Sequence, residues 1–302
     1  MIFDYKYPWQ QQFFDKFNEI DTDLIIPLSD GEAYRKYPNH SWVYNKLSLM
    51  EALKYPCAPH GIYPKDIDYP VISKPITNLT GMGAGIEFSS NPGSLDEHYT
   101  PGHFWTKQFF GRHISIDLLI KNGEIVWFCP TEGIPDQIRV GAFEAWNILT
   151  DFIIPEPISL FFNEYFKEFK GIVNIELIGE HMIEMHLRMS SQWIDLNGET
   201  WTQDLINFYL FNSTEINRNI PKGHSIPLFL DDYPSQQLSE KFINDTIDIF
   251  KLSSIQITYD INKLRNRSSM PPGGVRVAVI NSTNYYSAIL AKEHIRNQFQ
   301  TP

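Results

Sequence analysis

Residues 172–188, with the sequence IVNIELIGEHMIEMHLR, have the pattern of two short strands joined by a tight turn at Gly179 and Glu180. Side chains of a strand alternate between the two faces of a sheet, so alternate residues of neighbouring strands share a face. In this hairpin the shared face can carry two carboxylates, an imidazole and a guanidinium, from Glu176, Glu184, His186 and Arg188. Neighbouring carboxylates repel each other and favour a bound cation, and Mg²⁺ prefers such oxygen ligands. A solvated strand face with alternating charges would show the same pattern.

A lysine and a glycine-rich loop lie upstream, in residues 71–85, VISKPITNLTGMGAG. Lys74 stands at the end of an apolar strand, and Gly81, Gly83 and Gly85 follow it. Glycine lets backbone N–H groups approach phosphate oxygens, and lysine supplies a positive charge. The order differs from that of a P-loop, where the lysine follows the glycines, and a dinucleotide-binding fingerprint would need a further G-x-x-G spacing. An ordinary hairpin with an exposed lysine is the competing interpretation.

Two further stretches carry polar side chains at strand spacing. One polar run occupies alternating positions of an apolar stretch, at His113, Ser115 and Asp117. It suits either a binding face or an ordinary polar sheet face. A glycine turn at 271–274 leads to Arg276 on an apolar strand. Either the turn delivers this arginine to an anionic substrate, or it is an ordinary turn without a binding role. The sequence contains no G-x-S-x-G, H-E-x-x-H or C-x-x-C motif, which argues against hydrolase, zinc-protease and thiol-redox functions.

Composition places the chain among globular proteins and limits its partners. Of its 302 residues 42% are hydrophobic, and 25 Lys and Arg stand against 36 Asp and Glu, for a formal net charge of −11. This balance argues against a general nucleic-acid binder or an anionic-membrane binder, because both need a basic face. The two cysteines, Cys57 and Cys129, are expected to be free thiols. Without an apolar signal core or a stretch of about 20 apolar residues, we expect a soluble, cytoplasmic protein.

The spacing of apolar residues predicts an α+β (mixed α/β) fold. Helices are expected over residues 8–20, 45–53, 143–165 (interrupted at Pro155 and Pro157), 201–211, 236–250 and 285–299. Strands are expected over residues 23–27, 69–75, 86–90, 104–110, 113–120, 125–129, 172–178, 182–187, 225–230, 255–259 and 273–280. The pair Asn122-Gly123 is typical of a hairpin turn, and residues 57–61 interrupt the pattern. The helices do not alternate with parallel strands, which argues against a single Rossmann sheet.

Taken in chain order, these pieces resemble the ATP-grasp superfamily over residues 42–212. Proteins of that superfamily carry a lysine-proline pair at the end of a strand and then a glycine-rich loop, as residues 71–85 do. A hinge and a polar strand follow, which residues 109–117, FFGRHISID, resemble. The superfamily's E-x-N-x-R strand is similar to residues 184–188, EMHLR. The resemblance implies two α+β subdomains that grip ATP between them.

The same resemblance implies a division of the chain and a set of site residues. Residues 1–41 would form a short N-terminal α/β segment, residues 42–212 the nucleotide- and metal-binding core, and residues 213–302 the remainder of the fold with a candidate substrate region. The implied ATP-binding residues are Lys46, Lys74, Thr80, Gly81, Met82, Gly83, Lys107, Gln108, Phe109 and His113. The implied ligands of one or two Mg²⁺ ions are Glu176, Glu184 and His186. The implied catalytic residues are Lys74, Arg188 and Arg276.

The implied activity is the ADP-forming joining of a small carboxylate to an amine through an acylphosphate. Two positions depart from the superfamily's pattern, since His186 stands where asparagine is usual and His113 where glutamate is usual. Two other functions therefore stay open, a small-molecule kinase on the same scaffold and a non-catalytic nucleotide-binding protein. The pattern names neither the carboxylate nor the amine, and it indicates no oligomeric state.

Overall fold

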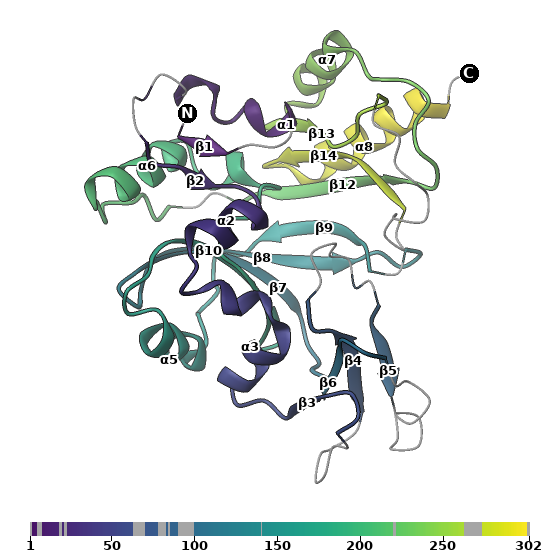
Figure 1. Ribbon diagram of the computed structural model, residues 1–302. Coiled ribbons are helices and arrows are strands. Elements are labelled where there is room, and N and C mark those ends of the chain that lie inside the picture. Colours follow the sequence, from purple (N-terminus) through teal and green to yellow (C-terminus); the bar gives the residue numbers. More distant parts are fainter. Residues whose placement is uncertain are drawn as a thin grey trace. The chain divides into compact units, whose positions relative to one another are not determined.

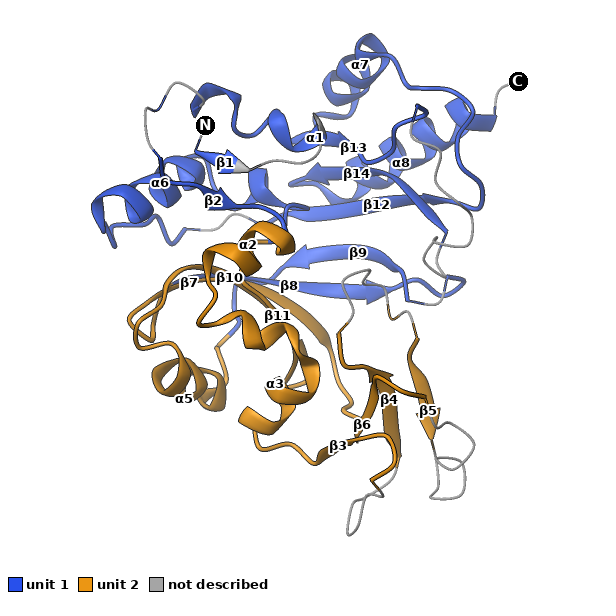
Figure 2. Cartoon of the chain, in the orientation of Figure 1, with its two compact units in different colours: residues 1–29, 127–152, 190–302 blue, residues 30–126, 153–189 orange. Residues whose placement is uncertain are grey.

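A computed structural model describes residues 2–4, 8–17, 20, 23–62, 70–77, 83, 85–89, 100–139, 141–219, 222–262 and 274–300 of the chain. The protein forms two compact units, drawn in blue and orange in Figure 2. Unit 1 consists of Met1–Ser29, Trp127–Phe152 and Ser190–Pro302, and unit 2 consists of Asp30–Val126 and Ile153–Met189. The two units alternate along the chain, whereas the expected segments 1–41, 42–212 and 213–302 follow one another. That division stays a prediction.

Unit 2 contains the hairpin expected at residues 172–188. Strand β10 (Lys170–Ile178) pairs antiparallel with β11 (His181–His186), and its other edge pairs antiparallel with β7 (His113–Lys121). A register shift lies between Glu176 and Leu177. In the pairing of β7 with β10, Ile114, Ile116 and Leu118 lie opposite apolar residues of β10, whereas Ser115 and Asp117, which point to the other face, lie opposite polar ones. This sheet therefore has one apolar and one polar face.

Unit 2 also contains a second antiparallel sheet, ordered β3-β6-β4-β5. Its strands, labelled in Figure 1, are β3 (Cys57–Pro59), β4 (Val71–Pro75), β5 (Glu87–Ser89) and β6 (His103–Lys107). The described helices of this unit are α2 (Asp30–Lys36), the 3₁₀ turn Ser41–Tyr44, α3 (Lys46–Ala52) and α5 (Glu156–Tyr165). Helix α3 begins at a side-chain cap, because Asn45 Oδ1 accepts from the backbone N of Ser48 at 3.0 Å.

Unit 1 receives the chain through β8 (Glu124–Pro135), which follows β7 across the Asn122-Gly123 turn. Both turn residues have positive φ angles, 54° and 85°, as the predicted hairpin turn requires. The strand order continues as β8-β9-β12-β14-β13, with β9 (Phe143–Ile148), β12 (His224–Leu230), β13 (Ser254–Ile257) and β14 (Val275–Ser282). A short parallel pair joins β1 (Phe3–Asp4) to β2 (Ile26–Pro27). The described helices are α1 (Pro8–Gln11), the 3₁₀ turns Asp15–Phe17 and Ile194–Leu196, α6 (Trp201–Phe211), α7 (Glu240–Phe250) and α8 (Tyr285–Gln300).

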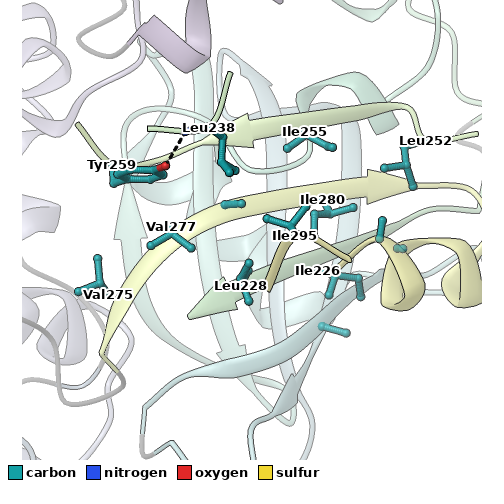
Figure 3. Packing of buried hydrophobic residues seen from close by; sticks show 14 residues of the cluster. Ile226, Leu228, Leu238, Leu252, Ile255, Tyr259, Val275, Val277, Ile280 and Ile295 are labelled. Atoms are coloured by element: carbon teal, nitrogen blue, oxygen red, sulfur yellow. Dashed lines mark hydrogen bonds between the residues drawn. The ribbon is translucent and has the colours of Figure 1, made fainter. Parts of the chain in front are cut away.

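Figure 3 shows the apolar core of unit 1 around β12, β13 and β14. Ile226 and Leu228 of β12 and Ile280 of β14 are fully buried, and Ile295 of α8 packs into the same cluster. Tyr259 closes one end, where its hydroxyl accepts a hydrogen bond from the backbone N of Leu238 at 3.0 Å. Burial of several such side chains stabilises the fold by about 1.5–3 kcal/mol each. In the part of the chain that the structure describes, no helix is long and apolar enough to cross a membrane.

The helix expected over residues 143–165 is wrong in its first part. Residues Phe143–Ile148 form strand β9, which pairs with β8 and β12, and only Glu156–Tyr165 are helical. Ala145, Trp146 and Ile148 are buried on both faces of β9, so the strand lacks the alternating pattern that would have marked it. Pairing with two neighbours here outweighs the helix propensity of Glu144 and Ala145.

Two smaller expectations also need correction, and one further helix was not expected. Of the described residues in the helix expected over 8–20, Pro8–Gln11 are α-helical and Asp15–Phe17 form a 3₁₀ turn, and Phe14 between them is fully buried and stacked on Phe3. Residues 57–61 do not merely interrupt the pattern, because Cys57–Pro59 form strand β3 on the edge of β6. Helix α2 was not expected at all. Cys57 and Cys129 are free thiols, as predicted.

A close backbone contact in unit 2 leads to a testable prediction about stability. Gly179, in the β10–β11 turn, has a φ of +62°, and a Cβ atom there would lie 2.8 Å from the carbonyl oxygen of Phe110. Gly102 has a similar φ of +78°, but a Cβ there meets nothing within 4 Å. Gly102→Ala should lose about 1–2 kcal/mol of unfolding free energy through its backbone conformation alone. Gly179→Ala should lose a further ~1–3 kcal/mol from overpacking. Urea unfolding of both variants measures the difference, and equal losses would contradict the importance of this contact.

Candidate active site

The polar face of β7, β10 and β11 carries the candidate site. Glu176 lies directly across from Glu184 on one side and from Ser115 on the other, so these three residues form a row across the three strands. The next row consists of Asp117, Asn174 and His186. The register thus confirms the predicted shared face for Glu176, Glu184 and His186, whereas Arg188, predicted with them, follows the last paired residue of β11.

This polar face is not a solvated one. Asp117 is fully buried, and Asn174 Nδ2 donates hydrogen bonds to Asp117 Oδ1 at 2.8 Å and to Ser115 Oγ at 3.0 Å. The side chains of Glu184 and His186 are only 18% and 12% exposed. Buried polar groups are costly unless they are paired, so their accumulation on one face indicates a functional site rather than an ordinary strand surface.

A chain of ion pairs within unit 2 links the end of this hairpin to the start of α2. Lys46 Nζ donates to Glu184 Oε2 at 2.9 Å, and the other oxygen of Glu184, Oε1, lies 3.4 Å from His186 Nε2. His186 Nδ1 lies 2.9 Å from Asp30 Oδ1, and Arg188 Nη2 donates to Asp30 Oδ2 at 3.0 Å. Arg188 also donates through Nη1 to the carbonyl of Met189. Each of the five charged side chains in this series of ion pairs, Lys46, Glu184, His186, Asp30 and Arg188, therefore lies against at least one group of opposite charge.

The pKa values follow from these contacts. Burial would raise the pKa of Asp30, but the Arg188 charge and the His186 contact hold it well below its usual range. Burial would likewise raise the pKa of Glu184, and the His186 and Lys46 contacts lower it instead. Burial and the Arg188 charge lower the pKa of His186, but Asp30 and Glu184 outweigh them and raise it. Both carboxylates are therefore ionised at neutral pH.

Two lysines lie beside Glu184. Lys46, the first residue of α3, donates its backbone N–H to the carbonyl of Ile76 at 2.8 Å, which ties the start of α3 to the end of β4. Lys74 of β4 is only 7% exposed, and its Nζ donates to the carbonyl of Ile183 at 3.3 Å. Its ammonium also lies 5.4 Å from the centre of the Phe104 ring. Sequence reasoning identified both lysines, and the structure brings both to β11.

Lys74 is the least compensated charge of the site. It forms no salt bridge with any carboxylate in the described ranges, whereas Lys46 is paired with Glu184. Burial, together with the charge of Lys46, lowers the pKa of Lys74 to about 8. This buried ammonium donates to a carbonyl and lies near an aromatic ring, and the nearby charges of Glu184 and Glu176 only partly offset the effect of its burial, so it favours an added anion, such as a phosphate.

His113 and the expected hinge residues also belong to unit 2. His113 Nε2 lies 3.1 Å from Glu176 Oε2, so the histidine contacts one of the three candidate metal ligands. The backbone N–H groups of Lys107 and Gln108 donate to the carbonyls of Pro56 and Pro70. Phe109 stacks on His181 with ring centroids 4.2 Å apart.

The remaining predicted residues are not gathered at this face by the described structure. Thr80, Gly81 and Met82 lie outside the described residues, and Gly83 has a φ of +67°, which is typical of a glycine turn. Arg276 belongs to unit 1, on β14, where its Nη1 donates to Gln192 Oε1 at 3.0 Å. The catalytic role of Arg276 stays a prediction.

Sequence reasoning missed two residues that shape the site. Asp30 begins α2 and pairs with both His186 and Arg188, more than 150 positions further along the chain. Tyr44 accepts a hydrogen bond from the backbone N of Leu187 through its hydroxyl at 3.1 Å, and thereby holds the residue between His186 and Arg188. The run Ser29-Asp30-Gly31-Glu32 is a typical helix start, which would have predicted α2 but not its partners.

The donor set fits a divalent cation in part. Within the described ranges no three His, Cys, Asp or Glu side chains already form a metal-binding group. Glu184 Oε1 and His186 Nε2 do approach each other, and Glu176 stands across the sheet from Glu184. Carboxylate oxygens with phosphate oxygens and water are the usual surroundings of Mg²⁺ in proteins, so these residues can contribute to such a site.

Comparison with known proteins supports the fold. No protein-family model matches the sequence, and no curated protein matches it. Phosphoribosylamine–glycine ligase from Thermotoga maritima superposes with a TM-score of 0.61 at 12% identity, over 97% of this chain and 86% of that one. L-amino acid ligase from Bacillus licheniformis gives 0.57 at 11% identity, over 95% and 82%. The biotin carboxylase domain of Hydrogenobacter thermophilus 2-oxoglutarate carboxylase, solved with MgADP, ADP and bicarbonate, gives 0.58 at 12% identity, over 99% and 79%.

The fold of this chain is thus similar to that of these enzymes, as the predicted resemblance to the ATP-grasp superfamily implies, and the predicted α+β fold class is confirmed. Identities of 11–12% establish the fold alone. The function must be argued from the site.

Proposed function

We propose that this protein is an ATP-dependent ligase that joins a small carboxylate to an amine and releases ADP and phosphate. The observation that carries the proposal is Lys74, a buried ammonium beside Lys46 and Glu184 that forms no salt bridge with a carboxylate among the described residues. A nucleotide phosphate supplies the negative charge that Lys74 lacks. The neighbour solved with MgADP supports the choice of a magnesium nucleotide as that anion.

The charged side chains on and beside the polar face then have the following roles. Lys74 and Lys46 bind phosphate oxygens and offset their charge, and the loop that contains Gly83 provides backbone N–H groups for them. Glu176, Glu184 and His186 hold one or two Mg²⁺ ions. A bound Mg²⁺ neutralises charge that develops on the β- and γ-phosphates during transfer. Arg188, held in place by Asp30, stabilises the charge of the transferred phosphoryl group.

The reaction balances in two steps. A substrate carboxylate oxygen attacks the γ-phosphorus of ATP, the bond from that phosphorus to the β–γ bridging oxygen breaks, and ADP leaves. The amine nitrogen then attacks the carbonyl carbon of the acylphosphate, phosphate leaves, and the nitrogen loses a proton to give the amide. The protein supplies positioning and electrostatic stabilisation, with no covalent intermediate on its own side chains.

The test is a screen of amino acids and other carboxylates with a panel of amines in the presence of MgATP. We expect ADP and inorganic phosphate in equal amounts, with an amide product of the summed mass less water in the mass spectrum. A stable phosphorylated product without inorganic phosphate would show a kinase instead. AMP and pyrophosphate would show adenylation. Tight ATP binding without turnover across the panel would favour a non-catalytic nucleotide-binding protein.

A further inference from the structure

A group of buried polar side chains lies in unit 1, where the 3₁₀ turn Ile194–Leu196 meets β13 and β14. Ser254 of β13 lies directly across from Asn281 of β14, and Gln256 follows two positions later, so these three side chains point to one face of the sheet. Asp195 reaches the same face from the turn, because its Oδ1 accepts a hydrogen bond from Asn281 Nδ2 at 2.6 Å. Gln256 and Asn281 are fully buried, and Ser254 is only 4% exposed.

Two hydrogen bonds fix the orientation of both amide groups. The carbonyl of Gln192 accepts from Gln256 Nε2 at 2.8 Å and from Asn281 Nδ2 at 2.9 Å. A carbonyl can only accept, so the nitrogen of each amide must be the atom that faces it. The amide oxygens, Gln256 Oε1 and Asn281 Oδ1, are thereby directed elsewhere, and neither has a hydrogen-bond partner among the described residues.

The other two side chains of the group also leave an oxygen without a partner. Asp195 Oδ2 and Ser254 Oγ are buried, and within the described ranges neither atom has a hydrogen-bond partner. Asn197 and Trp201 carry unpartnered buried atoms as well, but theirs include N–H donors. Buried polar atoms are costly unless something satisfies them. Four buried oxygens, one of them from a carboxylate, are satisfied by a ligand that brings positive charge.

The chain itself does not supply that charge. In the part of the chain that the structure describes, no ion pair joins Asp195 to a lysine, arginine or histidine. Burial raises the pKa of Asp195, and the contacts with Asn281 and Ser254 only partly oppose this effect. One carboxylate among neutral oxygens balances a single positive charge, whereas Ca²⁺ takes about six to eight oxygens with several carboxylates among them, and Mg²⁺ keeps several of its waters.

We propose that this oxygen group, which consists of Asp195, Ser254, Gln256 and Asn281, binds one monovalent metal cation, K⁺ or Na⁺. The ion joins the turn Ile194–Leu196 to β13 and β14 and offsets the charge of the carboxylate. Protein oxygens replace the water around such an ion, as carbonyl oxygens do in K⁺-selective pores. None of the four residues is among those assigned to the nucleotide, so this ion site is independent of the proposed function.

The first test is urea unfolding of the full-length protein without nucleotide in KCl or NaCl, with tetramethylammonium chloride keeping the ionic strength constant. An ion that binds only the folded chain stabilises it with the logarithm of its concentration once the site is saturated. The unfolding midpoint should therefore rise with K⁺ or Na⁺ between about 1 and 100 mM. Tetramethylammonium is too large for a buried site of this kind and should give no rise. Equal midpoints in all three salts would overturn the proposal.

Variants assign the effect to the oxygen group. Asp195→Asn should remove the salt dependence, because it removes the charge that holds the ion and its amide nitrogen can donate to the neighbouring oxygens instead. Asp248→Asn, at an exposed position of α7, is the matched control and should keep the dependence. Ser254→Ala removes one oxygen and should raise the ion concentration needed for half of the effect about tenfold. This variant carries the test if Asp195→Asn does not fold, and an unchanged dependence in either folded variant would contradict the site.

The second test locates the ion directly. Crystals grown in KCl and in NaCl should show an ion in contact with Asp195 Oδ2 in at least one of the two salts, and anomalous scattering at long wavelength identifies K⁺. Water alone at this position in both salts would overturn the proposal.

Discussion

Glu184→Gln should abolish ADP release that depends on the carboxylate substrate. The substitution keeps the shape of the side chain but removes the charge that Lys46 and the proposed metal ion share. A single electrostatic contact to the transition state contributes about 2.7–4 kcal/mol, so kcat should fall about 10²–10³-fold or more. A coupled assay for ADP, with each substrate omitted in turn, measures this effect.

The matched control is Glu180→Gln in the turn of the same hairpin. Glu180 is exposed, and we expect its substitution to leave both turnover and stability unchanged. Glu184→Gln should still fold, with about 1–3 kcal/mol less stability, because Lys46 loses a charged partner. Circular dichroism and urea unfolding separate that loss from the catalytic one. Unchanged turnover in folded Glu184→Gln would sink the assignment of Glu184.

Lys74→Met should produce opposite effects on binding and on stability. ATP affinity should fall about 10–150-fold, because a hydrogen bond to a charged group contributes about 1.5–3 kcal/mol. Stability should rise by about 1–3 kcal/mol at pH 7, because methionine is not penalised for the burial that lowers the pKa of Lys74 to about 8. Isothermal titration with ATP and urea unfolding without nucleotide measure the two effects.

The stability difference should depend on pH in a defined window. Because the pKa of Lys74 is lowered from 10.5 to about 8 by folding, the cost of its charge is fully present below about pH 8. That cost diminishes as the pH rises from about 8 towards 10.5, where the unfolded chain also loses the proton. The advantage of Lys74→Met over the wild type should therefore shrink across this range. Exposed Lys167 provides the control, since Lys167→Met should change neither ATP affinity nor this pH dependence. A loss of stability in Lys74→Met at pH 7 would contradict the view of Lys74 as an uncompensated charge.

The hairpin of β10 and β11 shows how far sequence reasoning reaches. The period of two, the turn at Gly179 and the polar alternation together predicted that Glu176, Glu184 and His186 share a face, and the register confirms it. Such a prediction succeeds because it depends on neighbours only a few positions apart. Lys74 was identified from its place at a strand end before a glycine-rich loop, and Lys46 from the family resemblance. Their approach to β11 from β4 and α3 is a property of the folded chain.

Asp30 and β9 show where sequence reasoning stops. Asp30 meets His186 across more than 150 positions, and no local pattern contains that information. Strand β9 has apolar side chains on both faces, so its sequence lacks the period that distinguishes a strand from a helix. In both cases the decisive interactions are long-range, with β8 and β12 for the strand and with β11 for the aspartate.

The alternation of the two units along the chain has a consequence for the order in which they can fold during synthesis. Four boundaries separate the units, after Ser29, Val126, Phe152 and Met189. All of unit 2, with every charged partner of His186 described above, lies between residues 30 and 189, interrupted only by 127–152. During synthesis, unit 2 therefore has its whole sequence once Met189 is added, whereas unit 1 still lacks β12, β13, β14 and α8. The polar site can thus assemble on the growing chain before the core of Figure 3 has been made.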